Sequence, residues 1–156
     1  MIEIREVLLP EQKTAICNDV LRTLPNWFGC EESLVEYVAG VGDKPFYGVF
    51  DRNAPVGFAA VKVHNAHTAE IYVIGIKEAY HGQGIGKKLV AECEDFCRWH
   101  CMDFLTVKTL ADTVDDVSYA RTRGFYEAVG FRPLEVFPLH WHESSPCLFM
   151  AKHVKA

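Results

Sequence analysis

The sequence contains no long hydrophobic run and no stripe of basic residues. None of its apolar runs approaches the ~20 residues that a membrane-spanning helix needs. The N-terminus, Met-Ile-Glu-Ile-Arg-Glu, lacks the basic and apolar regions of a signal peptide. The net charge of −5 argues against nucleic acid as the main partner. These absences predict a cytoplasmic protein that acts on neither a membrane nor a nucleic acid.

Motifs for disulfides and metals are also missing. The six cysteines include no Cys-x-x-Cys pair. Cys93, Cys97 and Cys101 recur every four residues, which indicates one buried helix face because a free cysteine behaves as a small apolar residue. His140 and His142 have the spacing of two imidazoles on one side of a strand, but no third ligand lies near them. We therefore expect no bound metal.

The chain shows no internal repeat, low-complexity tract or linker. Its 156 residues, 49% of them hydrophobic, suit one domain with a core large enough to fold unaided. The sequence thus predicts a single domain over residues 1–156.

Apolar periodicity predicts the order β-α-α-β-β-β-α-β-α-β-β. Helices are expected at 10–24, 31–39, 84–100 and 118–129. Strands are expected at 2–7, 46–51, 56–64, 69–77, 103–110, 132–139 and 147–152, with a hairpin turn at 52–55 and another at Pro146. This order indicates an α+β domain in which helices cover a twisted, mostly antiparallel sheet.

Residues 80–88 read Tyr-His-Gly-Gln-Gly-Ile-Gly-Lys-Lys and lie between an apolar and an amphipathic run. Strand, glycine turn and helix is the natural interpretation. Three glycines leave the backbone N–H groups open to close approach, and the helix adds unpaired amides and the positive end of its dipole. The stretch therefore predicts a cradle for an anion, most naturally a phosphate.

Two common nucleotide motifs do not fit this stretch. A P-loop needs Gly-x-x-x-x-Gly-Lys-Ser/Thr, whereas residue 81 is His and residue 88 is Lys. A dinucleotide fingerprint, Gly-x-Gly-x-x-Gly, fails in both registers because Lys87 and Leu89 stand at its last position. The spacing and the charge together exclude a nucleotide-binding regulator.

Residues 81–86, His-Gly-Gln-Gly-Ile-Gly, resemble motif A of the GNAT superfamily of acyl-CoA-dependent N-acyltransferases, Arg/Gln-x-x-Gly-x-Gly/Ala, with His81 in place of Arg or Gln. Residues 122–131 resemble the end of the family's motif B, Ala-x-x-Leu/Phe-Tyr-Glu-x-x-Gly-Phe, with Thr122 in place of Ala. Tyr119 stands where many members carry an Asn that contacts the cofactor. The element order matches the GNAT fold along essentially the full length, which implies splayed central strands.

The resemblance implies acetyl-CoA as a co-substrate. Backbone groups of the central strand would bind the pantetheine arm, and main-chain amides of the glycine turn would hold the pyrophosphate. The implied cofactor-binding residues are Ile74, Gly75, Ile76, His81, Gly82, Gln83, Gly84, Ile85, Gly86, Lys87 and Tyr119. For Gly75, a β-bulge is an equally good interpretation.

Acyl transfer to an amine requires that an ammonium lose a proton and that the departing thiolate be protonated. The resemblance implies Tyr126 as the general acid on the sulfur and Glu70, eleven residues before His81, as the base. Other interpretations remain open. Tyr126 could be a packing aromatic and Glu70 a solvent-facing residue, and His64, His67, His81 or a water could act as the base.

In the resembled family the two N-terminal helices cover the acceptor side, which makes Trp27, Phe28, Tyr37 and the loop 111–117 candidates for the acceptor pocket. The aromatic residues could instead be core residues. The acidic loop would favour a cationic amine if it faces the site, and is otherwise a solvated loop. Two functions follow. One is N-acetyl transfer to a primary amine of a small molecule or protein; the other is a catalytically silent acyl-CoA-binding sensor or interaction module. The apolar and aromatic segment 137–142 lies near the end of the sheet, where members of the resembled family often pair, so the resemblance implies a homodimer.

Overall fold

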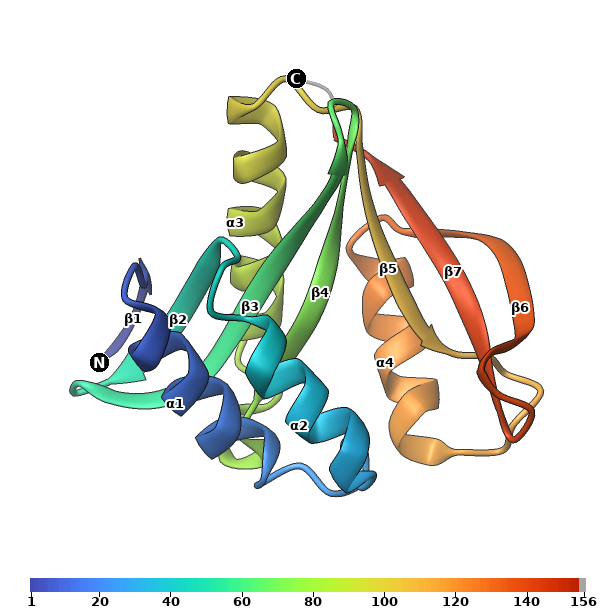
Figure 1. Ribbon diagram of the computed structural model, residues 1–156, viewed down its shortest axis with the longest axis horizontal. Coiled ribbons are helices and arrows are strands. Elements are labelled where there is room, and N and C mark those ends of the chain that lie inside the picture. Colours follow the sequence, from blue (N-terminus) through green and yellow to red (C-terminus); the bar gives the residue numbers. More distant parts are fainter. Residues whose placement is uncertain (155–156) are drawn as a thin grey trace. The chain divides into compact units, whose positions relative to one another are not determined.

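The computed structural model describes residues 1–154, which contain seven strands, four α-helices and one 3-10 turn in the predicted order (Figure 1). The elements are β1 (Ile2–Glu6), α1 (Pro10–Leu21), α2 (Glu31–Gly40), β2 (Phe46–Asp51), β3 (Ala54–Asn65), β4 (Thr68–Ile76), the 3-10 turn η1 (Glu78–Tyr80), α3 (Ile85–Trp99), β5 (Phe104–Leu110), α4 (Val117–Ala128), β6 (Arg132–His142) and β7 (Ser145–His153). Among the helices of this part of the chain, none is long and apolar enough to cross a membrane.

The strands follow the order β1-β2-β3-β4-β5-β7-β6 in the sheet. The pairs β1–β2, β2–β3, β5–β7 and β6–β7 are antiparallel, and β4 pairs in parallel with β5. The predicted α+β class with a mixed, mostly antiparallel sheet is therefore confirmed. The chain forms two compact units: Met1–Lys62 with Ile71–Asp95, called unit 1, and Val63–Glu70 with the chain from Phe96 onward, called unit 2. A single domain and splayed central strands stay predictions.

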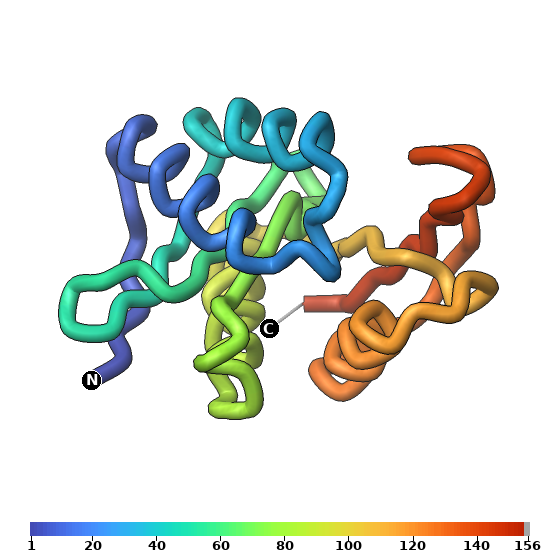
Figure 2. Tube along the Cα trace, turned by 90° about the horizontal axis from the view of Figure 1, so that it is seen from below, coloured from blue at the N-terminus to red at the C-terminus, as the bar shows by residue number. Residues whose placement is uncertain are grey.

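Within unit 1, α1 and α2 cover one face of β3 and β4, and α3 covers the other (Figure 2). α1 begins at Pro10, whose missing N–H costs nothing in the first helical turn. It buries Ile16, Val20 and Leu21, which recur at helical spacing. Beneath them the rings of two buried phenylalanines, at positions 46 and 58, stack with centroids 5.1 Å apart.

Within unit 2, α4 packs beside β5. Asp116 caps the helix by accepting a hydrogen bond from the backbone N–H of Tyr119 at 3.0 Å. Arg123 donates to the carbonyl of Leu110 at the end of β5 over 2.7 Å. The cap and this hydrogen bond set where α4 begins and how it lies against the strand.

Two local predictions are wrong. Cys93 and Cys97 are fully buried as expected, but α3 ends at Trp99 and Cys101 is exposed with a positive φ of 57°. The amide of Cys101 donates to the carbonyl of Arg98, and the next amide donates to that of Cys97, which is the hydrogen-bond pattern of a Schellman motif. The helix stops here, so the four-residue spacing no longer keeps Cys101 on the buried face.

The turn predicted at Pro146 lies earlier, at residues 143–144. Pro146 is instead the second residue of β7, where its carbonyl accepts a hydrogen bond from the amide of Ala111 at 2.9 Å. Proline is tolerated at the start of a strand because it loses only a donor there. The β2–β3 turn lies at Arg52 and Asn53, both with positive φ.

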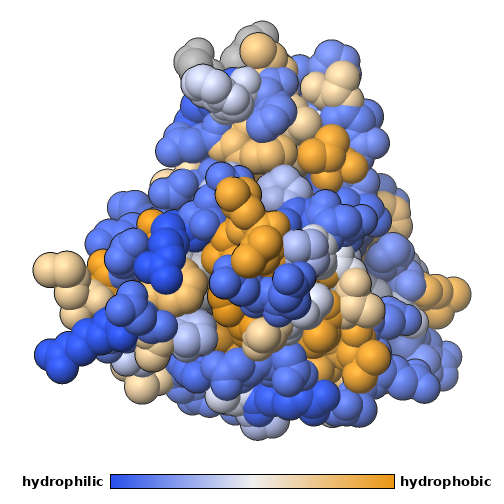
Figure 3. Space-filling model, turned by 60° about the vertical axis from the view of Figure 1, so that its left-hand side comes forward, coloured by the Kyte–Doolittle hydropathy of each residue, from blue (hydrophilic) through white to orange (hydrophobic). Residues whose placement is uncertain are grey.

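Unit 1 also has a hollow of about 530 Å³ bounded by β1, the β1–α1 connection, α1 and the start of β3. Leu8 and Leu9, both exposed, line it, and the guanidinium of Arg5 lies 3.8 Å from the ring centroid of Phe50. Figure 3 brings this side forward and shows hydrophobic side chains gathered among hydrophilic ones. The glycine turn contributes no residue to the lining of this hollow.

Candidate active site

The glycine turn has the backbone that an anion cradle requires. Gly82 and Gly84 have φ values of 75° and 79°, in the left-handed region that glycine enters without strain. A Cβ added at either would meet no atom within 4 Å, so open space lies beside the turn. The first i→i−4 hydrogen bond of α3 runs from the amide of Lys88 to the carbonyl of Gly84. The amides before it lie at the positive end of the helix, and this arrangement fits a phosphate.

A tyrosine and a carboxylate anchor the chain just before this turn. The hydroxyl of Tyr80 donates to Oδ2 of Asp51 at 2.7 Å, and the N-terminal ammonium lies 3.2 Å from Oδ1. The hydrogen bond from Tyr80 lowers the pKa of Asp51, and the carboxylate in turn raises the pKa of the phenol. Sequence reasoning missed this pair because its members are 29 residues apart on different elements.

Two side chains of the predicted cofactor site turn back onto the protein. Nε2 of His81 lies 2.6 Å from the carbonyl oxygen of Ile76, and its ring makes an edge contact with Trp27. Because a carbonyl can only accept, the proton of the neutral ring lies on Nε2. The amide nitrogen of Gln83 donates to the carbonyl of Ala79 at 3.3 Å. The cradle is therefore mainly a backbone structure, with exposed Lys87 and Lys88 adding positive charge.

Gly75 lies where α1 packs closely against β4. A Cβ there would come within 3.2–3.3 Å of Val20, Leu21 and Leu24, which belong to α1 and the residues after it. Three positions earlier, Tyr72 packs against Tyr37 of α2, although residues three apart on a regular strand face opposite sides. Alternation is therefore interrupted between Tyr72 and Gly75, as the bulge interpretation implies. The neighbouring Ile74 and Ile76 are half-buried.

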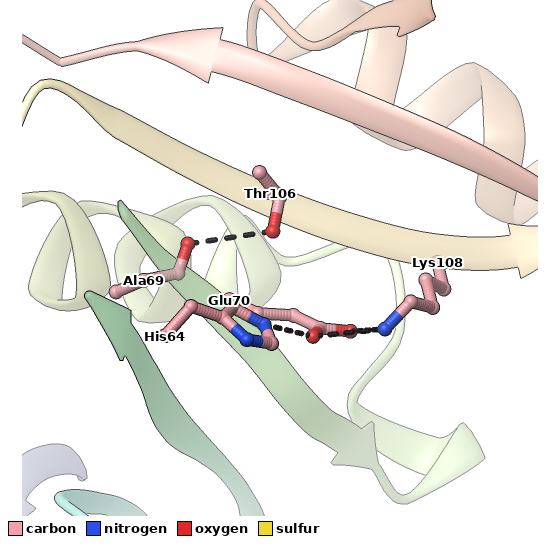
Figure 4. Close-up of polar contacts among 5 residues, drawn as sticks. All are labelled: His64, Ala69, Glu70, Thr106 and Lys108. Atoms are coloured by element: carbon pink, nitrogen blue, oxygen red, sulfur yellow. Dashed lines mark hydrogen bonds and ion pairs between the residues drawn. The ribbon is translucent and has the colours of Figure 1, made fainter. Parts of the chain in front are cut away.

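Glu70 is the buried member of a polar cluster in unit 2, called here the Glu70 cluster, which consists of His64, Glu70 and Lys108 (Figure 4). Its carboxylate is only 7% exposed. Oε1 lies 2.6 Å from Nε2 of His64, and Nζ of Lys108 donates to both oxygens at 3.1 and 3.2 Å. A buried carboxylate needs such partners because leaving water is otherwise costly. The interpretation of Glu70 as a solvent-facing residue is wrong.

Three strands assemble this cluster. His64 lies on β3 and Glu70 on β4. Glu70 pairs with Thr106 in the parallel β4–β5 ladder, and Lys108 lies two residues after Thr106 on the same face of β5. Buried Cys147 on β7 is close enough for the charges of Lys108 and Glu70 to act on it, and burial raises the pKa of its thiol to about 11. Cys147 is therefore a neutral thiol at physiological pH. No spacing within one element reveals the cluster, so sequence reasoning missed Lys108.

The two tyrosines of interest on α4 have different surroundings. Tyr126 is 4% exposed, with the rings of Phe125 and Phe131 each 5.5 Å from its own. Tyr119 is half-buried in the first turn, where burial, with a smaller contribution from Asp116, raises the pKa of its phenol to about 12. In this setting the phenol of Tyr119 stays neutral at physiological pH.

The aromatic candidates for an acceptor pocket pack against the core of unit 1. Trp27, Phe28 and Tyr37 are partly buried against it, and the ring of Tyr37 lies edge-on to Phe28. Of the predicted bases besides Glu70, His67 is strongly exposed and pairs with Asp103 at 3.3 Å. Among residues 1–154, no group of three or more His, Cys, Asp or Glu side chains could hold a metal ion.

Comparison with known proteins gives one family. The model of the acetyltransferase (GNAT) family matches residues 13–131. A mycothiol acetyltransferase of Beutenbergia cavernae is 30% identical over 128 residues, which cover 81% of this chain and 37% of that protein. The chain therefore spans about a third of that relative's length.

Solved structures share the fold at low sequence identity. A protein assigned to the GNAT family from Desulfovibrio desulfuricans has a TM-score of 0.84 at 20% identity, with 99% of each chain covered. An aminoglycoside 6′-N-acetyltransferase complexed with coenzyme A has a TM-score of 0.75 at 18% identity, with 99% of this chain and 97% of that chain covered.

Proposed function

We propose a function from the premise that this chain belongs to the acetyltransferase (GNAT) family, whose model matches about three quarters of it. The protein moves an acetyl group from acetyl-CoA to a primary amine of a small molecule or protein, by direct attack of the amine on the thioester. The observation that carries this proposal is the open backbone cradle at Gly82 and Gly84, at the start of α3.

The cradle favours coenzyme A as the ligand. A pyrophosphate presents closely spaced anionic oxygens, which suit several main-chain amides at a helix N-terminus. The related aminoglycoside acetyltransferase structure is complexed with coenzyme A, and its fold is that of this chain. Residues 82–87 would hold the pyrophosphate, and the backbone of Ile74, Gly75 and Ile76 would bind the pantetheine arm. Tyr119, on α4, would replace the Asn that many members use.

Tyr126 would protonate the departing thiolate. A phenol has a pKa of about 10, so it is neutral at pH 7 and can still donate to a sulfur anion. The buried ring between two phenylalanines supports this role because packing holds the hydroxyl in one place. Exposed Asp112 and Asp115 in the loop before α4 favour a cationic acceptor. The cytoplasmic location and the absence of a metal stay predictions.

Release of coenzyme A across a panel of amines tests the proposal. Purified protein is incubated with acetyl-CoA and each amine, and the acetylated product is measured by mass spectrometry. Thiol reagents need a protein-only control because Cys30 and Cys101 are free and exposed. Turnover with at least one amine is expected. Binding of acetyl-CoA without turnover on any amine would favour the alternative function, a catalytically silent acyl-CoA-binding sensor.

A second copy of the chain would pair along β6. This strand lies at one end of the strand order and is exposed along nearly its whole length, with Leu134 62% and Leu139 73% exposed. Pro133 and Pro138 limit backbone pairing, so side chains would form most of the contact. Light scattering should report twice 17.6 kDa, and Leu139→Lys should shift the protein toward monomer. A wild-type mass of 17.6 kDa at all concentrations would contradict the dimer.

A further inference from the structure

We propose that His64 accepts the proton of the attacking amine and that Glu70, held by Lys108, is a positioning residue that orients the imidazole. This inference rests on the proposed acetyl transfer and gives roles to the members of the Glu70 cluster. It replaces Glu70 as the proton acceptor implied by the family resemblance.

Glu70 is poorly placed to accept the proton itself. Its side chain is 7% exposed, and both carboxylate oxygens already accept hydrogen bonds from Lys108. Oε1 also lies 2.6 Å from His64. A substrate ammonium would have to displace the ammonium of Lys108 to reach it. These contacts suit a carboxylate that fixes the positions of its neighbours.

His64 has the exposure that Glu70 lacks. Its side chain is 33% exposed, near the end of β3, and only Nε2 is directed at the carboxylate. An ionised carboxylate accepts hydrogen bonds and cannot donate, so it holds the proton of the neutral imidazole on Nε2. The lone pair is then on Nδ1. An imidazole exchanges protons near neutral pH, and a carboxylate behind it fixes its tautomer and stabilises the imidazolium, as in a catalytic triad.

The charges around His64 permit this role. Nε2 of His64 contacts the carboxylate of Glu70, which in turn accepts from the ammonium of Lys108, and both of these charges act on the thiol of Cys147. The charges of Glu70 and Lys108 compensate each other, and Cys147 is neutral, since burial raises the pKa of its thiol to about 11. The ammonium of Lys108 is therefore compensated within the Glu70 cluster when a proton arrives on Nδ1.

The reaction balances with these groups. The substrate ammonium gives one proton to Nδ1 of His64, and its neutral nitrogen bonds to the carbonyl carbon of the thioester. The C–S bond breaks, and the thiolate takes the phenolic proton of Tyr126. The second proton of the nitrogen returns to the phenol through solvent, and His64 releases its proton to solvent. The net products are an N-acetyl amine, coenzyme A as the thiol and one proton.

NMR of the protein without substrate tests the geometry independently of activity. With 15N-labelled imidazoles, neutral His64 should be protonated on Nε2 and unprotonated on Nδ1. Glu70→Gln should change this pattern because an amide can donate as well as accept. The opposite tautomer in the wild-type protein would overturn the proposal.

Kinetics with the most active amine of the panel test the chemistry. His64→Gln keeps a donor for Glu70 but cannot accept a proton, so kcat should fall ~10²–10⁴-fold with the KM for acetyl-CoA unchanged. The rising limb of the pH profile should disappear, and added imidazole should restore part of the activity of His64→Ala. Glu70→Gln should lower kcat less than His64→Gln does, and it should shift the rising limb of the pH profile without removing it. His100→Gln, which removes an exposed histidine outside the cluster, is the matched control.

The outcomes separate this inference from the proposed function. Wild-type turnover together with an unchanged kcat and pH limb in His64→Gln would overturn the role of His64 alone. No turnover of any amine by the wild-type protein would overturn both.

Discussion

Tyr126→Phe should lower kcat by ~10²–10⁴-fold and leave the affinity for acetyl-CoA nearly unchanged. The substitution keeps the buried ring between Phe125 and Phe131 but removes the proton that the phenol would give to the thiolate. One lost hydroxyl hydrogen bond contributes only about 0.5–1.5 kcal/mol to binding. The measurement compares kcat, under conditions where chemistry limits the rate, with a calorimetric Kd for acetyl-CoA.

The control for Tyr126→Phe separates chemistry from packing. Phe125→Leu weakens the aromatic contact on α4 and keeps the phenol, so it should lower the unfolding temperature more than it lowers kcat. Tyr126→Phe should have the opposite pattern. Wild-type kcat in Tyr126→Phe would show that the phenol is structural, and the general acid would then be a water or another residue.

Gly84→Asp should abolish binding of acetyl-CoA, which we expect in the micromolar range for the wild-type protein. The new carboxylate would lie where the pyrophosphate is expected, and like charges repel at short range. The φ of 79° at Gly84 means that any other residue is also strained, by roughly 1–2 kcal/mol. Gly84→Ala carries the same strain without the charge, so the difference between the two variants isolates the electrostatic effect.

Gly86→Asp separates binding from stability more clearly than Gly84→Asp, because residue 86 lies in the first turn of α3. An acidic residue there interacts favourably with the helix dipole, so the fold should be retained or slightly stabilised. Binding should nevertheless be lost, and this separation of stability from affinity is the expected signature of an anion site. Unchanged calorimetric affinity in both aspartate variants would rule out the cradle as the pyrophosphate site.

The element order could be predicted from sequence because its signals are local. The spacing of Ile16 and Val20 identifies α1, and Gly130 with its positive φ follows the end of α4. The glycine turn is equally local, since Gly82 and Gly84 alone allow the left-handed backbone that opens the amides. The predictions for Cys101 and Pro146 are wrong because the end of α3 and the start of β7 are set by hydrogen bonds between residues that are not adjacent in the sequence.

The sequence by itself determined the cradle, because the conformation of the glycine turn and the start of α3 depend on residues that are neighbours in the chain. Only the tertiary structure decided the Glu70 cluster, because His64, Glu70 and Lys108 come from three strands and meet through strand pairing. Two other features also depend on the tertiary structure. They are the close packing of α1 against Gly75 and the hydrogen bond from Tyr80 to Asp51. A backbone conformation is a property of neighbouring residues, whereas a buried charge depends on whichever side chains the fold brings to it.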